Sequence, residues 1–157
     1  MDTMERDALI ERLARMPSLL ADAVAGLPAA RWTCKPAPGS FSPVEHACHL
    51  RDLEAEGYQV RIRRLIEEDL PTLDEVDGSA WATERGYQAQ SLREALADFT
   101  RHRQATLGLL ADGLPRHAGR KGLFGGFGIV TLAGLAREIA AHDAGHLQEL
   151  QALRLAG

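Results

Sequence analysis

The sequence predicts an all-α protein, a four-helix bundle with long connections, because two independent features favour helices throughout. Aromatic residues make up only 5% of the 157 residues, β-branched runs are scarce, and Ala, Leu, Arg and Glu dominate the long segments. Four of these segments repeat apolar residues at steps of three and four, the spacing of one helix face. We expect a single domain over residues 1–157, with an up-down-down-up or related helix order and no sheet beyond a short hairpin.

Bulk properties argue against several classes of partner. The net charge of −4 and the pI near 5.8 disfavour a nucleic-acid-binding protein, which normally carries a concentrated basic face. The first residues lack the basic and apolar regions of a secretory signal, and no apolar run approaches the roughly 18 residues that span a bilayer. Cys34 and Cys48 form no CxxC pair. We therefore expect no nucleic-acid partner, no membrane partner and a reduced, cytoplasmic protein.

The first two helices are marked by periodicity and by caps. The first should run roughly from Asp2 to Leu27, and the second from Ser42 to about Asp69. Ser42 is a good N-cap and Glu45, three residues later, completes a capping box. The apolar face of the first helix consists of Leu9, Leu13, Met16, Leu20 and Val24.

A long connection at residues 70–90 leads to the third helix. We expect this connection to lie over one end of the core, where functional sites tend to be. Ser91 and Glu94 form a second capping box that opens the helix, and Gly113 and Pro115 are expected to end it.

The fourth helix carries the most informative pattern. It follows a Gly-rich stretch at residues 119–128, expected to be a loop or a short extended piece, and should run from a cap at Thr131 to about Leu155. His142 and His146 lie one turn apart on its apolar stripe, and two imidazoles so spaced can converge on one metal ion. The alternative is two independently hydrogen-bonded core histidines. The rest of the stripe is Leu132, Leu135, Ile139, Leu150 and Leu153.

A third ligand has to come from another helix, and the second helix offers His46 and His49. His49 lies on a narrow polar strip, which either faces solvent or lines a polar cavity at the bundle centre. His46 points about 60° away, nearer Leu53 and Gly57, where it can pack against a neighbouring helix or a dimer partner. The strip consists of Glu45, His49, Asp52, Glu56, Gln59 and Arg63.

Two segments together resemble a known family. Residues 35–54, KPAPGSFSPVEHACHLRDLE, are similar to the second-helix signature of the DinB/YfiT-like superfamily, with an aromatic-Ser opening followed by His-Leu-x-x-x-Glu. Residues 128–150, GIVTLAGLAREIAAHDAGHLQEL, are similar to its last-helix signature. Both occur in order with the right separation, so the resemblance spans nearly the whole chain and implies a single DinB-like helical-bundle domain.

The resemblance implies a metal site and an activity. In this superfamily three histidines bind a divalent metal, commonly zinc or nickel, and the matching residues here are His49, His142 and His146. His46 does not lie at the motif position and is a reserve candidate ligand; we expect its removal to leave metal binding nearly normal. Asp52 and Glu138 are candidate hydrogen-bond partners of the ligand histidines.

Characterised relatives are largely thiol-dependent transferases that use bacillithiol or mycothiol. The resemblance therefore implies a metal-dependent small-molecule transferase, a homodimer, with a thiol cosubstrate and an electrophilic substrate; no catalytic residue beyond the metal ligands is identified. The alternative is a non-catalytic, stress-associated protein that binds a metal or a ligand. An open coordination position favours the enzyme, and a fourth protein ligand favours the alternative.

Three other reactive side chains have simpler explanations. Arg103 lies on the apolar stripe of the third helix, where a buried structural ion pair or a snorkelling side chain is favoured over a contact with a ligand carboxylate. Cys48 lies on the apolar side of the second helix and is expected to be an inert core residue. Cys34 lies in a loop without a clear activating neighbour.

Overall fold

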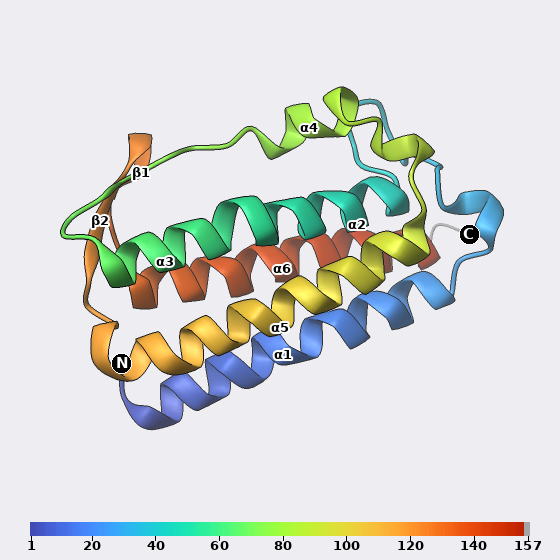
Figure 1. Cartoon of the computed structure of the whole chain (residues 1–157). Helices are drawn as coiled ribbons and strands as arrows, with labels where there is room; N and C mark the ends of the chain where they lie inside the picture. The colour runs from blue at the N-terminus through green and yellow to red at the C-terminus, as the bar shows by residue number, and fades with distance from the viewer. Residues whose placement is uncertain (156–157) are drawn as a thin grey trace.

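Four long helices lie side by side in the computed structural model, which describes residues 1–155 (Figure 1). All four predicted helices are present, and α1 and α6 run in one direction while the second long helix and α5 run in the other. This is the predicted up-down-down-up order; the last two residues of the predicted domain, 156–157, lie outside the described range. α1 spans Thr3–Ala25, α5 spans Leu92–His117 and α6 spans Leu132–Leu155. The second long helix has three successive parts: α2 (Pro43–Asp52), η2 (Leu53–Tyr58) and α3 (Gln59–Glu67).

The predicted caps hold each long helix at its first turn. Ser42 and Glu45 form the reciprocal capping box expected at α2. At α5, Ser91 accepts a hydrogen bond from the N–H of Glu94, which is one half of the predicted box. At α6, Thr131 Oγ1 accepts from the N–H of Gly134 at 2.9 Å. The starts of these helices are therefore fixed by local chemistry that the sequence displays.

The long connection runs along the bundle and not over one end of it. The second long helix and α5 are parallel, so the chain has to return along their full length before α5 can begin (Figure 1). It does so through a short strand, β1 (Thr72–Leu73), a short helix, α4 (Gly78–Glu84), and a 3₁₀ turn, η3 (Tyr87–Ala89). Both α4 and η3 contact α2. The expected position over one end was wrong because a parallel pair of helices needs a crossover.

The predicted end of the third helix was also wrong, since α5 passes Gly113 and Pro115 and ends at His117. Gly113 lies where two helices approach closely: a Cβ atom there would lie 2.7 Å from Cδ1 of Ile66. Glycine at this position serves helix packing and not helix termination. Pro115 falls in the last turn, so the i→i−4 hydrogen bond that its ring removes lies at the end of the helix and not in its interior.

The second long helix contains a π-helical turn that the periodicity did not predict. η2, from Leu53 to Tyr58, has the wider i→i+5 winding and separates α2 from α3. Gly57 accommodates it, since a Cβ atom there would lie 2.7 Å from Cδ1 of Leu53. The turn buries Glu54, which is only 1% exposed, and the following Gln59, which donates to the carbonyl of His102.

A small sheet closes one end of the bundle. β2 (Lys121–Phe124) and β3 (Gly128–Thr131) form an antiparallel hairpin, and β1 adds to β2 in parallel, giving the order β1-β2-β3. The Gly-rich stretch expected to be a loop or short extended piece is thus the hairpin allowed by the fold prediction, but the expectation of no sheet beyond a hairpin was wrong, because the crossover adds β1 as a third strand. It leads directly into α6, whose first N–H, from Leu132, donates to the carbonyl of Arg120.

A buried guanidinium on α5 contacts all three of the other long helices. Arg103 of α5 donates to both carboxylate oxygens of Glu54 in η2, at 2.6 and 3.0 Å, and to both of Asp143 in α6, at 2.6 and 2.9 Å. It also donates to the carbonyl of Leu13 in α1. Burial lowers the pKa of Arg103, but the hydrogen bonds to Asp143 and Glu54 outweigh this and raise it above its usual value. The predicted structural ion pair is confirmed.

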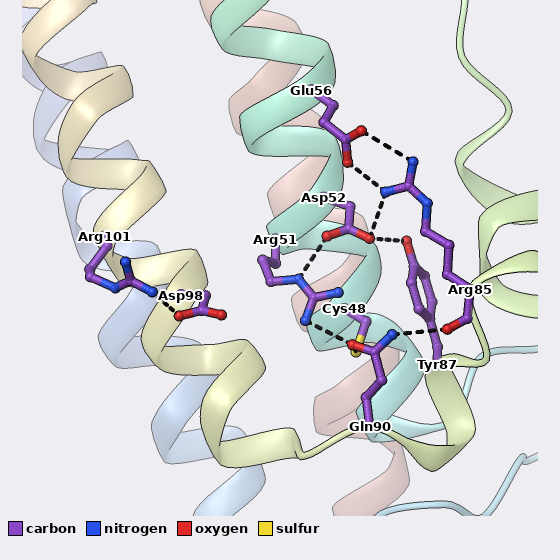
Figure 2. A network of polar contacts seen from close by, with 9 residues as sticks. All are labelled: Cys48, Arg51, Asp52, Glu56, Arg85, Tyr87, Gln90, Asp98 and Arg101. Atoms are coloured by element: carbon purple, nitrogen blue, oxygen red, sulfur yellow. Dashed lines mark hydrogen bonds and ion pairs between the residues drawn. The ribbon is translucent and has the colours of Figure 1, made fainter.

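Arg103→Met should lower the free energy of unfolding by about 3–5 kcal/mol, because two buried carboxylates would lose their cation. Urea unfolding followed by far-UV circular dichroism measures this change. Arg101→Met, two residues earlier on the same helix, is the matched control, since Arg101 pairs with Asp98 at the surface (Figure 2). Equal losses in the two variants would contradict a structural role for the buried pair.

Candidate metal centre

Three histidine rings meet between α2 and α6. His49 comes from α2, and His142 and His146 come from successive turns of α6, which contacts α2. Nε2 of His142 lies 3.3 Å from Nε2 of His49 and 3.0 Å from Nε2 of His146. The structure therefore brings together the three residues that the sequence and the family resemblance select.

These separations suit a divalent cation. Metal–nitrogen bonds of about 2.0–2.1 Å at angles of about 90–110° place two nitrogens about 2.9–3.4 Å apart. Hydrogen bonding alone cannot satisfy the three nitrogens, because Nε2 of His142 faces two others and its single lone pair or proton can serve only one of them well. A cation would accept all three lone pairs. Within residues 1–155, no fourth histidine, cysteine or carboxylate joins this group, so one coordination position would stay open.

The Nδ1 atoms of the three histidines differ in their surroundings. Nδ1 of His49 lies 3.3 Å from the carbonyl oxygen of Gly78, and Nδ1 of His146 lies 2.7 Å from Nδ1 of His46. Nδ1 of His142 is buried without a hydrogen-bond partner in the described part of the chain. The sequence did not predict this contact of Gly78, because every residue has a backbone carbonyl and the residue type does not reveal which one will bind a histidine.

The expected partners Asp52 and Glu138 do not contact the histidines. Asp52 instead accepts hydrogen bonds from Arg51 at 2.7 Å, Arg85 at 3.0 Å and the Tyr87 hydroxyl at 2.6 Å (Figure 2). Its carboxylate thus ties α2 to the connection that carries α4 and η3. Glu138 lines a separate cavity together with Tyr58, Phe124 and Phe127.

The polar strip of the second helix is only partly covered by the connection. Glu45, His49 and Asp52 are buried, whereas Glu56 and Arg63 are exposed. The predicted solvent alternative thus holds for Glu56 and Arg63, whereas His49 faces the histidines of α6. The three buried residues belong to α2, which α4 and η3 contact.

Phe41 and a cleft border the histidine cluster. The ring centroid of Phe41 lies 5.2 Å from that of His49 and 6.2 Å from that of His146, so an apolar ring packs against the site. A cleft of about 530 Å³ is lined by Phe41, His46, His146 and Glu149, among others. The cluster is therefore partly shielded from water yet adjoins a cavity of small-molecule size.

His46 lies closer to the site than the sequence suggested. It packs against the neighbouring helix as expected, but its contact there is His146, and its Nε2 lies 3.3 Å from a carboxylate oxygen of Glu149. The expectation that the metal site is indifferent to His46 does not fit this geometry. The helical wheel gave the direction in which His46 points from α2. It did not give the point where α6 crosses α2, and that point decides which residue of α6 His46 contacts.

Burial shifts the pKa of every histidine in the cluster downward. Burial, followed by repulsion from neighbouring histidines, lowers the pKa of His46 and of His142 to about 4 and that of His146 to about 2. Burial also lowers the pKa of His49, although the Gly78 carbonyl and the charge of Asp52 oppose it. The rings are therefore neutral near pH 7, as metal ligation requires.

The cysteines take no part in the cluster. Cys48 is fully buried on the apolar side of α2, and burial raises its pKa to about 11, so its thiolate is disfavoured. Cys34 is exposed in the loop before α2. The prediction that Cys48 is a core residue is confirmed.

The fold and the cluster define a class: four-helix bundles in which paired helices present three histidines suited to a divalent metal. The sequence profile of the DinB superfamily matches residues 12–150, and the chain belongs to that superfamily. The family resemblance found in the sequence is thus confirmed.

Solved structures agree on the architecture. YfiT from Bacillus subtilis, described as a probable metal-dependent hydrolase with an unusual four-helix bundle topology, superposes with a TM-score of 0.83 at 20% identity, over 96% of this chain and 87% of that one. TT2238, described as a four-helix bundle protein, superposes with a TM-score of 0.68 at 25% identity, over 94% of this chain and 98% of that one. None of the curated proteins matches the chain. No helix in residues 1–155 is both long enough and apolar enough to cross a membrane.

Gly78→Ala should weaken metal binding by about 10-fold or more while the fold persists. A Cβ atom at this position would lie 2.7 Å from Cε1 of His49, so the ring would have to move away from its partners. Titration against a competing chelator measures the affinity. Gly145→Ala is the matched control, because it stands next to His146 in sequence but its Cβ would meet open space. Unchanged affinity in Gly78→Ala would show that His49 is not held by this contact.

The metal-free protein should lose stability as the pH falls from about 6.5 towards 4. Because the folded-state pKa of these histidines lies below the ordinary value, the unfolded chain binds more protons in this range, and the free energy of unfolding decreases. His142→Gln should remove roughly 1–3 kcal/mol of this dependence, measured by urea unfolding at several pH values. His117→Gln, at the far end of α5, is the control and should keep the wild-type slope. An identical slope in both variants would contradict a neutral, buried His142.

Proposed function

We propose that this protein binds one divalent metal ion through Nε2 of His49, His142 and His146 and uses it to act on small molecules. The observation that carries the proposal is the convergence of three neutral imidazoles at metal-ligand spacing beside a cleft. Three protein ligands with an open position are typical of catalytic metal sites, whereas structural sites are closed by four. Imidazole ligands suit zinc or nickel, the metals that the superfamily commonly holds.

The chain's own residues prepare the site for such chemistry. A divalent cation, when bound, lowers the pKa of a thiol or water that binds beside it and so supplies a nucleophile at neutral pH. Phe41 limits access of water to one side of the cluster, and the cleft beside His146 gives room for a substrate. The carbonyl of Gly78 orients the ring of His49 so that Nε2 faces the other two histidines.

The reaction we propose is transfer of a small-molecule thiol, of the bacillithiol or mycothiol type, to an electrophilic substrate. Membership of the DinB superfamily supports this choice, and the cleft of about 530 Å³ is in the size range of small-molecule sites. Hydrolysis is the competing reaction, because water can take the same open position; the description of YfiT as a probable metal-dependent hydrolase is of this kind. A homodimer and a cytoplasmic location remain predictions from the sequence.

Freshly purified protein should contain close to one equivalent of zinc or nickel by elemental analysis. His49→Ala, His142→Ala and His146→Ala should each lose most of it, since two remaining imidazoles hold a metal poorly. His117→Ala, whose ring is remote from the cluster, should keep the wild-type content. Equal metal content in all four variants would refute the site.

The activity is tested with the metal-loaded protein, a model electrophile and three conditions: bacillithiol, mycothiol or no thiol. Metal-dependent consumption of a thiol, lost in His142→Ala, is the expected result. Turnover of the electrophile without thiol would favour hydrolysis. Tight metal binding with a fourth protein ligand and no turnover would favour the non-catalytic binding protein.

A further inference from the structure

His46 contacts the candidate metal site without being one of its three ligands. Its ring is 1% exposed and is held between Phe41, whose ring lies edge-on at a centroid distance of 5.5 Å, and His146. Nδ1 of His46 lies 2.7 Å from Nδ1 of His146, and Nε2 of His46 lies 3.3 Å from Oε2 of Glu149. A charged or polar group so completely buried requires partners, and both ring nitrogens have one.

The proton positions along this chain of contacts follow from the metal ligand. A neutral imidazole carries one proton, so a His146 that offers the lone pair of Nε2 to a metal carries its proton on Nδ1. That proton can only be donated to Nδ1 of His46, which must then be unprotonated. The proton of His46 therefore lies on Nε2 and points towards the Glu149 carboxylate. The hydrogen bond from His146 to His46 and the contact from His46 to Glu149 then run in one direction.

We propose that His46 is a positioning residue that fixes the tautomer and ring orientation of His146, with Glu149 in turn fixing His46. The inference rests on metal ligation by His146 in the proposed function. It extends the common arrangement in which a metal-bound histidine donates its other N–H to an acceptor, here through a second imidazole before the carboxylate is reached.

The distances favour this role over direct ligation by His46. The 2.7 Å between Nδ1 of His46 and Nδ1 of His146 is an ordinary hydrogen-bond length. Two nitrogens bound to one ion would lie farther apart, at about 2.9–3.4 Å. Glu149 is 64% exposed in its side chain, and its Oε2 faces Nε2 of His46 at 3.3 Å at the surface of the cluster. His46, His146 and Glu149 all line the cleft, so a molecule that binds there would touch the same chain of hydrogen bonds.

Two substitutions at one position separate the hydrogen bond from packing. His46→Asn keeps an acceptor oxygen near the place of Nδ1, whereas His46→Leu fills the space without one. Zinc affinity, measured against a competing chelator, should fall by about 10–100-fold in His46→Leu and be largely restored in His46→Asn, with one zinc bound in each protein. Glu149→Gln, which keeps an acceptor for the N–H of His46, should change the affinity less than His46→Leu does.

The tautomers are read directly in the zinc-loaded wild-type protein by long-range ¹H–¹⁵N nuclear magnetic resonance. His146 should carry its proton on Nδ1 and His46 on Nε2. A His46 protonated on Nδ1 would overturn the inference, and this measurement stands even if His46→Leu fails to fold.

The remaining outcomes are also decisive. Wild-type affinity in a folded His46→Leu would reject the positioning role while leaving the proposed function intact. Two zinc ions in the wild type and one in both His46 variants would make His46 a ligand of a second ion and would equally reject it. A wild-type protein that binds neither zinc nor nickel would end the proposed function itself, and this inference with it.

Discussion

The buried guanidinium of Arg103 fixes how α6 lies against the second long helix. It pairs with Glu54 in the π turn and with Asp143 in α6, and each of these carboxylates lies close in sequence to a site histidine, His49 or His142. A bidentate contact on each side sets both the rotation and the axial position of a helix, because a shift would leave buried charge unpaired. The Nε2 atoms of the histidines meet at 3.0–3.3 Å as a consequence of this constraint.

The parallel course of the second helix and α5 supplies the other wall of the site. A parallel pair needs a crossover as long as the helices, and the crossover here passes over the polar strip of α2 (Figure 1). Asp52, held by Arg85 and Tyr87, anchors this crossover (Figure 2). The carbonyl of Gly78 reaches Nδ1 of His49. The crossover that the parallel helices require thus brings the Gly78 carbonyl to His49, a candidate metal ligand. Burial of the His49 ring under the crossover contributes to its lowered pKa.

Local signals predicted most of the fold and part of the site. The caps at Ser42, Ser91 and Thr131, the apolar periods and the i, i+4 histidines in α6 are all visible in the residues themselves. The π turn was not predictable, since its extra residue depends on the burial of Glu54 against a partner 49 positions away in the chain. The contact of His46 with His146 and the Gly78 carbonyl depend likewise on where helices cross and where a loop passes, which one helical wheel cannot give.

The central claim is that three imidazoles hold one divalent metal and leave one position open. X-ray absorption spectroscopy of the zinc-loaded protein tests it most directly, because it counts the imidazoles and measures the metal–ligand distances. We expect three imidazole nitrogens at about 2.0–2.1 Å from the zinc, and one further light atom from solvent. When a thiol is added, a sulfur atom at about 2.3 Å from the zinc should replace the solvent atom. Two or fewer imidazoles, or a protein ligand in the fourth position before any thiol is added, would contradict this account of the site.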